Sequence, residues 1–164
     1  VKAIGLTGAD MDVIRSVKRP VKDVDYGFVG DVQRVDADVL CHLLGQGAVP
    51  VMAPLTHDGA GHMLNTNADT IAGETALALA SHFDVTLVYC FEKKGVLMDE
   101  NDDDSVIPVI TPELFREYVQ QGIIGGGMIP KLENALAAVA GGVEKVIITA
   151  AEELGHGGGT VIKK

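Results

Sequence analysis

The stretch GGGMIPKLENALAAVAGGVEKVIITA, residues 125–150, joins a glycine-rich turn, a helix and a strand. Apolar residues and alanines at helical spacing after Pro130 predict the helix, and EKVIITA at 144–150 predicts the strand. The first charged residue of the helix is Lys131, which lies where the helix dipole is already positive. Two explanations stay open: an anion in front of the turn, or an ion pair with a carboxylate such as Asp69.

The same alternation of helices and strands runs through the rest of the chain. We expect strands at 1–6, 48–55, 84–91, 144–150 and 159–164, a hairpin or irregular strands at 17–32, and a hairpin at 57–64. Helices are expected at 36–46, 65–83, 111–122 and after 130. Asp36, Thr111 and either Thr66 or Asn67 are the expected N-caps, and Gly122 is the expected helix stop. The fold class is therefore α/β, with a mainly parallel sheet and helices on both faces.

Composition limits the classes of function. The chain has 164 residues, enough for a single domain over 1–164, and a formal net charge of -10, which argues against nucleic-acid and anionic-membrane partners. There is no apolar run long enough to span a membrane. Cys41 and Cys90 are far apart and form no CxxC pair, so we expect reduced packing residues in a cytoplasmic protein and no metal site built by cysteines.

Two polar segments have weak signals for metal binding. The acidic run 99–110 starts like a calcium loop, but Asp104 and Ile110 stand where the turn glycine and the bidentate glutamate belong. We therefore expect a solvated loop. His57 and His62 are five residues apart across a hairpin, which favours a surface feature over a weak metal site.

The segment NTNADT, residues 65–70, has polar side chains at alternate positions where a hairpin meets a helix: Asn65, Asn67 and Asp69. Free amides in the first turn of that helix would make an anion seat. A well-capped helix explains Asn67 and Asp69 equally well, because both suit a helix start. Asn65 has no such local role, and it is the more suggestive residue.

Five segments in this order resemble the amino-acid kinase family: YGFVGDV, the long run from Val51 to Ala80, GVLMD, the run from Gln121 to Ile148, and GGGTVI. The pairing of NTNAD with GGMIPK is the most specific part. The resemblance implies an open α/β/α sandwich that is homodimeric or a higher homo-oligomer. It also implies transfer of the γ-phosphoryl group of ATP, with Mg²⁺ bound through the nucleotide, to the side-chain carboxylate of an N-acyl-L-glutamate in arginine biosynthesis. Acetyl is the family default for the acyl group, and succinyl is a variant.

The resemblance also implies roles for individual residues. Lys131 matches the lysine that stabilises the transferring phosphoryl group, and Asp69 matches the aspartate that organises the catalytic lysines. Asn65, with Asn67 beside it, matches the substrate-binding segment. The residues that match the nucleotide-lining segments are Glu92, Lys93, Lys94, Gly95, Val96, Leu97, Ile123, Ile124 and Gly125.

Two departures from the family pattern affect the expected function. Phe91 and Glu92 stand where the family usually has a Thr/Ser-Asp pair, which alters the nucleotide pocket. The family's first-strand lysine, glycine-rich phosphate loop and substrate arginine have no match. The chain therefore resembles the C-terminal part of such a kinase, an incomplete and inactive portion. The alternative is a non-catalytic nucleotide- or metabolite-binding domain derived from the kinase.

Overall fold

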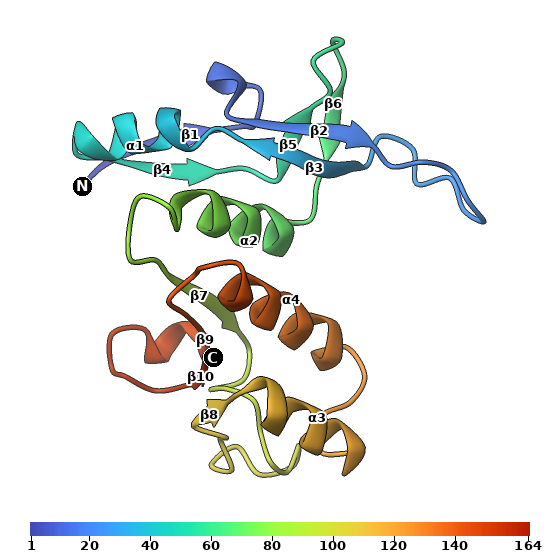
Figure 1. Cartoon of the computed structure of the whole chain (residues 1–164), viewed down its shortest axis with the longest axis vertical. Helices are drawn as coiled ribbons and strands as arrows, with labels where there is room; N and C mark the ends of the chain where they lie inside the picture. The colour runs from blue at the N-terminus through green and yellow to red at the C-terminus, as the bar shows by residue number, and fades with distance from the viewer. The chain divides into compact units, whose positions relative to one another are not determined.

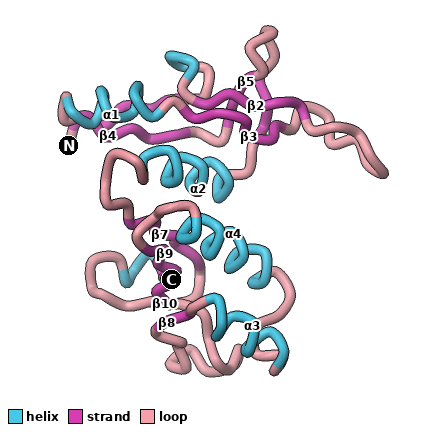
Figure 2. The backbone as a smooth tube through the Cα atoms, in the orientation of Figure 1, coloured by secondary structure: helices cyan, strands magenta, loops and turns pink.

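The computed structural model describes all 164 residues, which divide into two compact units. These are the N-terminal unit, residues 1–82, and the C-terminal unit, residues 83–164 (Figures 1 and 2). Both units combine helices with sheets, and four of the seven strand pairs are parallel, which confirms the α/β class. A single domain over the whole chain stays a prediction.

The N-terminal unit contains two sheets and two helices. Its elements are β1 (Lys2–Leu6), a 3-10 turn (Asp10–Asp12), β2 (Ile14–Lys18), β3 (Gly30–Val35), α1 (Ala37–Gly45), β4 (Ala48–Met52), β5 (Leu55–His57), β6 (Met63–Asn65) and α2 (Ala68–Leu79). β1 and β4 form a parallel pair, and the other sheet has the order β3-β2-β5-β6. The two expected hairpins are the antiparallel pairs β2–β3 and β5–β6.

Local hydrogen bonds explain where the helices of this unit begin. The Asp36 carboxylate accepts a hydrogen bond from the Val39 amide at 3.2 Å, so α1 begins with the expected cap. Behind this helix, a buried cluster of Val13, Ile14, Leu40 and Ile71 joins the β-strands to both helices. Of the apolar residues in α1, Leu40 is buried in this cluster and Val39 packs against it, whereas Leu44 is exposed.

The two histidines of the β5–β6 hairpin are bonded to different aspartates. His57 Nε2 lies 2.7 Å from Asp12 Oδ1, and His62 Nδ1 lies 2.7 Å from Asp58 Oδ2. The Ala60 amide, the His62 ring and the His62 amide all donate to the Asp58 carboxylate and lower its pKa to about 2. Each histidine therefore has a carboxylate partner of its own.

The C-terminal unit contains one four-stranded sheet. Its elements are β7 (Thr86–Phe91), β8 (Val109–Ile110), α3 (Pro112–Gln120), α4 (Met128–Ala140), β9 (Lys145–Ala150), a 3-10 turn (Ala151–Glu153) and β10 (Thr160–Ile162). The strand order is β7-β9-β10-β8, with β7–β9 and β8–β10 parallel and β9–β10 antiparallel. β10, the last expected strand, therefore runs antiparallel to β9.

The two helices of this unit begin and end as the sequence predicts, with one shift. The Thr111 hydroxyl accepts from the Leu114 amide at 3.3 Å and caps α3. Gly122 follows α3 with φ +73°, a conformation in which glycine has no steric cost. α4 begins at Met128, two residues before Pro130, and Pro130 lies in the first turn, where no intrahelical bond is lost.

α4 packs on the sheet through one face. Leu132, Ala135, Ala138 and Val139 are buried on the helix, and α4 contacts β9, where Val146 and Ile148 are buried. Alanines in the middle of this face allow a close approach of the helix to the strand. This packing fixes the direction of the first turn of α4, and with it the position of Lys131.

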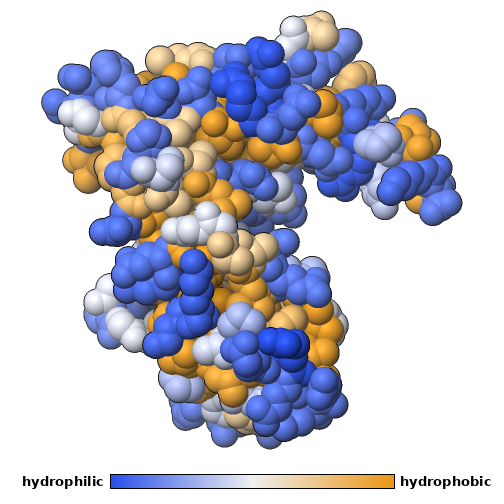
Figure 3. All heavy atoms as spheres, in the orientation of Figure 1, coloured by the Kyte–Doolittle hydropathy of each residue, from blue (hydrophilic) through white to orange (hydrophobic).

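The surface carries both polar and apolar residues. Figure 3 shows hydrophilic residues in blue over much of the visible face of each unit, with hydrophobic residues between them. No helix has the length and apolar character needed to cross a membrane. Cys41 and Cys90 are both free thiols.

We predict that Gly30→Ala destabilises the protein by about 1–3 kcal/mol, because the new methyl group would overpack a buried site. A Cβ atom on Gly30 would lie 2.9 Å from Leu64 Cβ and 3.0 Å from Ser16 Cβ, and neither atom is the end of a flexible chain. Gly5→Ala is the matched control, since a Cβ there meets nothing within 4 Å. Urea unfolding should show a loss for Gly30→Ala and no loss for Gly5→Ala; equal losses would contradict this account.

Candidate functional site

Two adjoining cavities of the C-terminal unit contain most of the predicted nucleotide residues. The first cavity, of about 450 Å³, is lined by Lys93, Gly95, Val96, Leu97, Glu100, Gly122, Ile123, Ile124, Gly125, Gly126, Gly127 and Met128. The second cavity, of about 550 Å³, is lined by Cys90, Phe91, Glu92, Lys93, Gly95, Met128, Lys131 and Ile148. Lys93, Gly95 and Met128 line both, so the two cavities adjoin and together make up the candidate site.

The structure brings two distant predicted segments together around the first cavity. Residues 95–97 and 123–125 are predicted nucleotide residues, and all of them line it together with Lys93. Glu92 lines the second cavity. Lys94 lines neither, and its ammonium lies 3.4 Å from Asp104 instead. The role of these residues in binding a nucleotide stays a prediction.

The three glycines before α4 face open space. A Cβ atom on Gly125, Gly126 or Gly127 would meet no atom within 4 Å, so packing inside the protein does not require glycine there. Only Gly126 has a positive φ, +53°. Because all three line the first cavity, the absence of side chains keeps this side of the cavity open.

The start of α4 offers few free backbone amides to an anion. The Met128 amide donates to the Gly125 carbonyl at 3.2 Å and the Ile129 amide to the Gly126 carbonyl at 3.4 Å. Pro130 has no amide hydrogen. The helix dipole still favours an anion here, and the donors at this end that have no acceptor within the protein are the amides of the three preceding glycines and the Lys131 ammonium.

Lys131 is half-buried, and its contact is aromatic. Its Nζ lies 3.7 Å from the centroid of the Phe91 ring, a cation–π distance. It forms no ion pair with a carboxylate of its own unit, where the lysine and arginine pairs are made by Lys93, Lys94 and Arg116. The predicted partner Asp69 belongs to the other unit.

Lys93, at the junction of the two cavities, is paired with the acidic run. Its ammonium donates to Asp103 Oδ1 at 2.6 Å. This hydrogen bond and the attraction of the carboxylate raise the pKa of Lys93 and lower the pKa of Asp103. Residues 99–104 of the acidic run are exposed, as expected for a solvated loop, and they carry counter-charges for the two lysines. The end of the run differs from the expectation, because Ile107 and Ile110 are buried and residues 109–110 form β8.

Thr160 is a supporting residue of the site that sequence reasoning missed. Its buried hydroxyl accepts a hydrogen bond from the Val96 amide at 2.8 Å and donates one to the Ile107 carbonyl at 2.7 Å. Gly95 lies so close that a Cβ there would be 2.8 Å from Thr160 Oγ1. The motif GGGTVI contains Thr160, but its partners lie 64 and 53 residues away, so no local pattern identifies them.

The predicted substrate residues lie at the β6–α2 junction of the N-terminal unit. Asn67 caps α2, because its Oδ1 accepts from the Thr70 amide at 3.1 Å. Asp69 lies in the first turn of α2 and is half-buried. Asn65 is the last residue of β6 and is exposed, and its backbone amide donates to the Phe28 carbonyl at 2.8 Å. The capping role is confirmed, while substrate binding by these residues stays a prediction.

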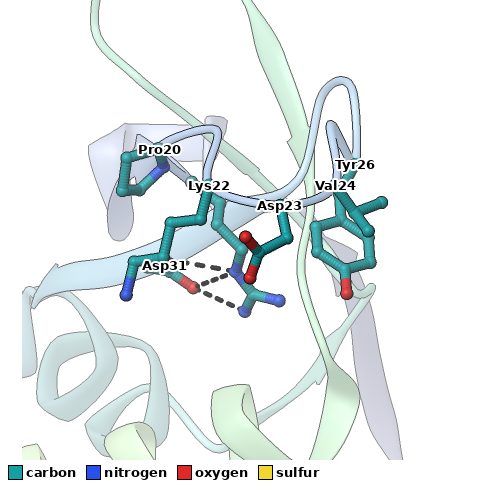
Figure 4. Close-up of a pocket in the computed structure, with 7 residues that line it drawn as sticks. Pro20, Lys22, Asp23, Val24, Tyr26 and Asp31 are labelled. Carbon is teal, nitrogen blue, oxygen red and sulfur yellow. Dashed lines mark hydrogen bonds and ion pairs between the residues drawn. The ribbon is translucent and has the colours of Figure 1, made fainter.

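A further cavity of about 390 Å³ lies in the loop between β2 and β3 (Figure 4). Arg19 lines it and donates to Asp31 at 2.6 Å, and its guanidinium lies over the Tyr26 ring at 5.8 Å. Lys22 and Asp23 line the same cavity. The motif YGFVGDV contains Tyr26 and Asp31, but sequence reasoning assigned neither residue a role.

The fold and these cavities have known counterparts. The model of the amino acid kinase family matches residues 1–150, and the chain belongs to that family. Its curated relatives have a narrower name. A protein of Phocaeicola vulgatus named acetylglutamate kinase is 77% identical over all 164 residues, and one of Methanopyrus kandleri with the same name is 41% identical over 167 aligned residues. The resemblance to acetylglutamate kinases is thereby confirmed over the whole chain.

The chain spans 64% of the length of the Phocaeicola vulgatus relative and 67% of the Methanopyrus kandleri relative. Among solved structures, one from Streptococcus mutans has a TM-score of 0.77 at 34% identity, covering 99% of this chain and 61% of that one. An N-acetylglutamate synthase from Neisseria gonorrhoeae has a TM-score of 0.83 at 21% identity, covering 100% of this chain and 38% of its own. The second likeness shows the fold alone.

We predict that Thr160→Val destabilises the C-terminal unit by about 2–4 kcal/mol, because two buried backbone groups lose their partner. Valine keeps the shape of the side chain but removes the hydroxyl. Thr160→Ser is the matched control, since it keeps the hydroxyl and should lose only about 1 kcal/mol for the missing methyl group. Urea unfolding measures both losses, and hydrogen exchange should speed up at the Val96 amide in Thr160→Val alone. Equal effects of the two variants would contradict a bracing role of the hydroxyl.

Proposed function

We propose that this chain forms the nucleotide-binding part, and part of the acceptor site, of an ATP-dependent kinase. The kinase would phosphorylate the side-chain carboxylate of an N-acyl-L-glutamate, a step of arginine biosynthesis. The acyl group is acetyl or succinyl, and acetyl has the support of the relatives' name, acetylglutamate kinase. Association into a homodimer or a higher homo-oligomer and a cytoplasmic location are further predictions of the same proposal.

The observation that carries the proposal is the open end of α4. Three glycines without packing partners border a cavity, and a lysine without a carboxylate partner in its unit lines the adjoining one. An anionic ligand that lies across both cavities would meet the ammonium groups of Lys93 and Lys131. The apolar residues Val96, Ile123 and Ile124 would contact a base in the first cavity.

Lys131 would act on the phosphoryl group during transfer. A loose phosphoryl transition state needs positioning and charge stabilisation rather than covalent help from the protein. The Lys131 ammonium, already placed at the cavity wall, would donate hydrogen bonds to the oxygens on which charge develops. Lys93 would contribute only after release from Asp103, because that carboxylate now holds its ammonium.

The remaining roles fall to the acceptor side and to Mg²⁺. Asp69 would organise the catalytic lysines, and Asn65 and Asn67 would bind the acceptor. No group of three or more potential metal-ligating side chains occurs in the chain. We therefore propose that Mg²⁺ is held mainly by phosphate oxygens of the nucleotide and neutralises part of their charge.

We predict that the 164-residue chain binds MgADP with a Kd on the order of millimolar or slightly better, roughly 4–5 kcal/mol. It should form no acylglutamate phosphate, because no segment matches the family's first-strand lysine or glycine-rich loop. Calorimetry and a hydroxamate assay with N-acetylglutamate measure the two properties. Gly125→Glu is a matched variant: it places a carboxylate beside the cavity without a clash, so it should abolish binding and leave the unfolding midpoint unchanged.

Two results would contradict this pair of expectations. Rapid turnover by the 164-residue chain would mean that the catalytic groups are wrongly assigned. A folded chain without any MgADP binding would exclude the nucleotide role of the two cavities. Binding without turnover in a full-length protein would instead favour the non-catalytic nucleotide-binding domain.

In a full-length kinase that contains these residues, we predict that Lys131→Ala lowers kcat by about 10²–10³-fold and changes the affinity for MgADP far less. The physical reason is that the ammonium would meet charge that develops in the transition state. Lys163→Ala, at an exposed position after β10, is the control. Steady-state kinetics and calorimetry separate the two effects, and an unchanged kcat with a raised KM would exclude this role.

A further inference from the structure

Phe91 and Lys131 form a cation–π contact between two elements that are far apart in the sequence. Phe91 is the last residue of β7, and Lys131 is the fourth residue of α4. The ammonium lies 3.7 Å from the ring centroid, well inside the distance of about 6 Å at which a cation is attracted by an aromatic face. Both side chains line the second cavity.

Rigid elements hold both partners. Tyr89, two residues before Phe91 on the same face of β7, is buried and stacks on the Phe91 ring with centroids 6.0 Å apart and an interplanar angle of 21°. β7 pairs with β9 up to Phe91 and Ala150, and α4 packs on β9. The Phe91 ring is therefore held in place by its own strand and by Tyr89. Because the lysine side chain is the more flexible partner, the ring sets the position of the ammonium.

An aromatic ring holds a cation in a way that a carboxylate does not. A carboxylate of the same unit in an ion pair with Lys131 would accept its hydrogen bonds and compete with an incoming phosphate, and the C-terminal unit contains no such pair. A π face attracts the ammonium through its quadrupole and leaves the net charge and N–H donors for an anion. Glu92 follows Phe91 and lines the same cavity, yet it forms no ion pair with Lys131.

We propose that Phe91 is a positioning residue for Lys131: its ring fixes the ammonium at the wall of the second cavity without neutralising it. This inference rests on the proposed function, because it assigns a task to the lysine that would stabilise the transferring phosphoryl group. It also accounts for Phe91 at a position where the family pattern has a small hydroxyl residue.

The contact itself is tested by NMR on the 164-residue chain. Protons above an aromatic face are shifted upfield, so the ε-CH₂ protons of Lys131, assigned by their loss in Lys131→Arg, should lie upfield of those of the other lysines. Phe91→Leu keeps an apolar side chain but removes the ring, and it should abolish the shift. Phe91→Trp should retain it, and Phe83→Leu, at an exposed phenylalanine, should leave it unchanged. An identical Lys131 shift in the original chain and Phe91→Leu would overturn the proposal.

The positioning role is tested by kinetics in a full-length kinase that contains these residues. Phe91→Leu should lower kcat by about 2- to 30-fold, the range that one cation–π contact accounts for, with little change in KM. Phe91→Trp should restore most of the loss. In a Lys131→Ala background, Phe91→Leu should cause no further loss, because the two residues act as a unit.

The kinetic outcomes separate the two proposals. If Lys131→Ala lowers kcat and Phe91→Leu does not, the positioning role is overturned and the proposed function stands. If Lys131→Ala leaves kcat unchanged, the proposed function fails, and with it the catalytic meaning of the contact, whatever the NMR shift shows. A loss in Phe91→Leu that persists in the Lys131→Ala background would also overturn the proposal, since it would act through another part of the site.

Discussion

The hydroxyl of Thr160 is the interaction on which the candidate site depends. It joins three segments that are far apart in the chain, because it accepts from the Val96 amide and donates to the Ile107 carbonyl from a fully buried position on β10. The segment before Val96 can approach it only because Gly95 has no side chain. The wall of the first cavity is therefore set by a buried pair of hydrogen bonds rather than by the exposed loop that follows it.

The second constraint is the packing of α4 on β9. Small residues on the buried face of the helix hold it against the strand, and this contact directs the first turn of α4 towards the end of β7. That placement brings the glycines ahead of the helix to the first cavity and Lys131 to the Phe91 ring. The Met128 and Ile129 amides are used in this turn, whereas the amides of the three preceding glycines have no acceptor within the protein. The helix dipole and Lys131 add positive charge at the same end.

The predicted nucleotide residues show how much of the candidate site can be inferred from sequence motifs alone. Residues 95–97 and 123–125 were assigned from family-like motifs, and they do meet around one cavity. Lys94 was assigned with them from its neighbours in sequence, yet it lines neither cavity and pairs with Asp104. Two successive lysines leave a turn in different directions, and a sequence does not state which one faces the cavity. Asp69 and Lys131, the predicted catalytic pair, belong to different compact units.

The sequence by itself determined the four helices, the strands apart from β8, the caps at Asp36 and Thr111, and the α/β class, and it left the cap of α2 open between Thr66 and Asn67. These follow from hydrogen bonds between near neighbours and from the periodicity of apolar residues, which a linear pattern contains. Only the tertiary structure decided that Thr160 braces Val96 and that the Phe91 ring holds Lys131. Those contacts join residues 64 and 40 positions apart, and they depend on how α4 and the strands pack, so the physical cause lies in three-dimensional packing rather than in local order.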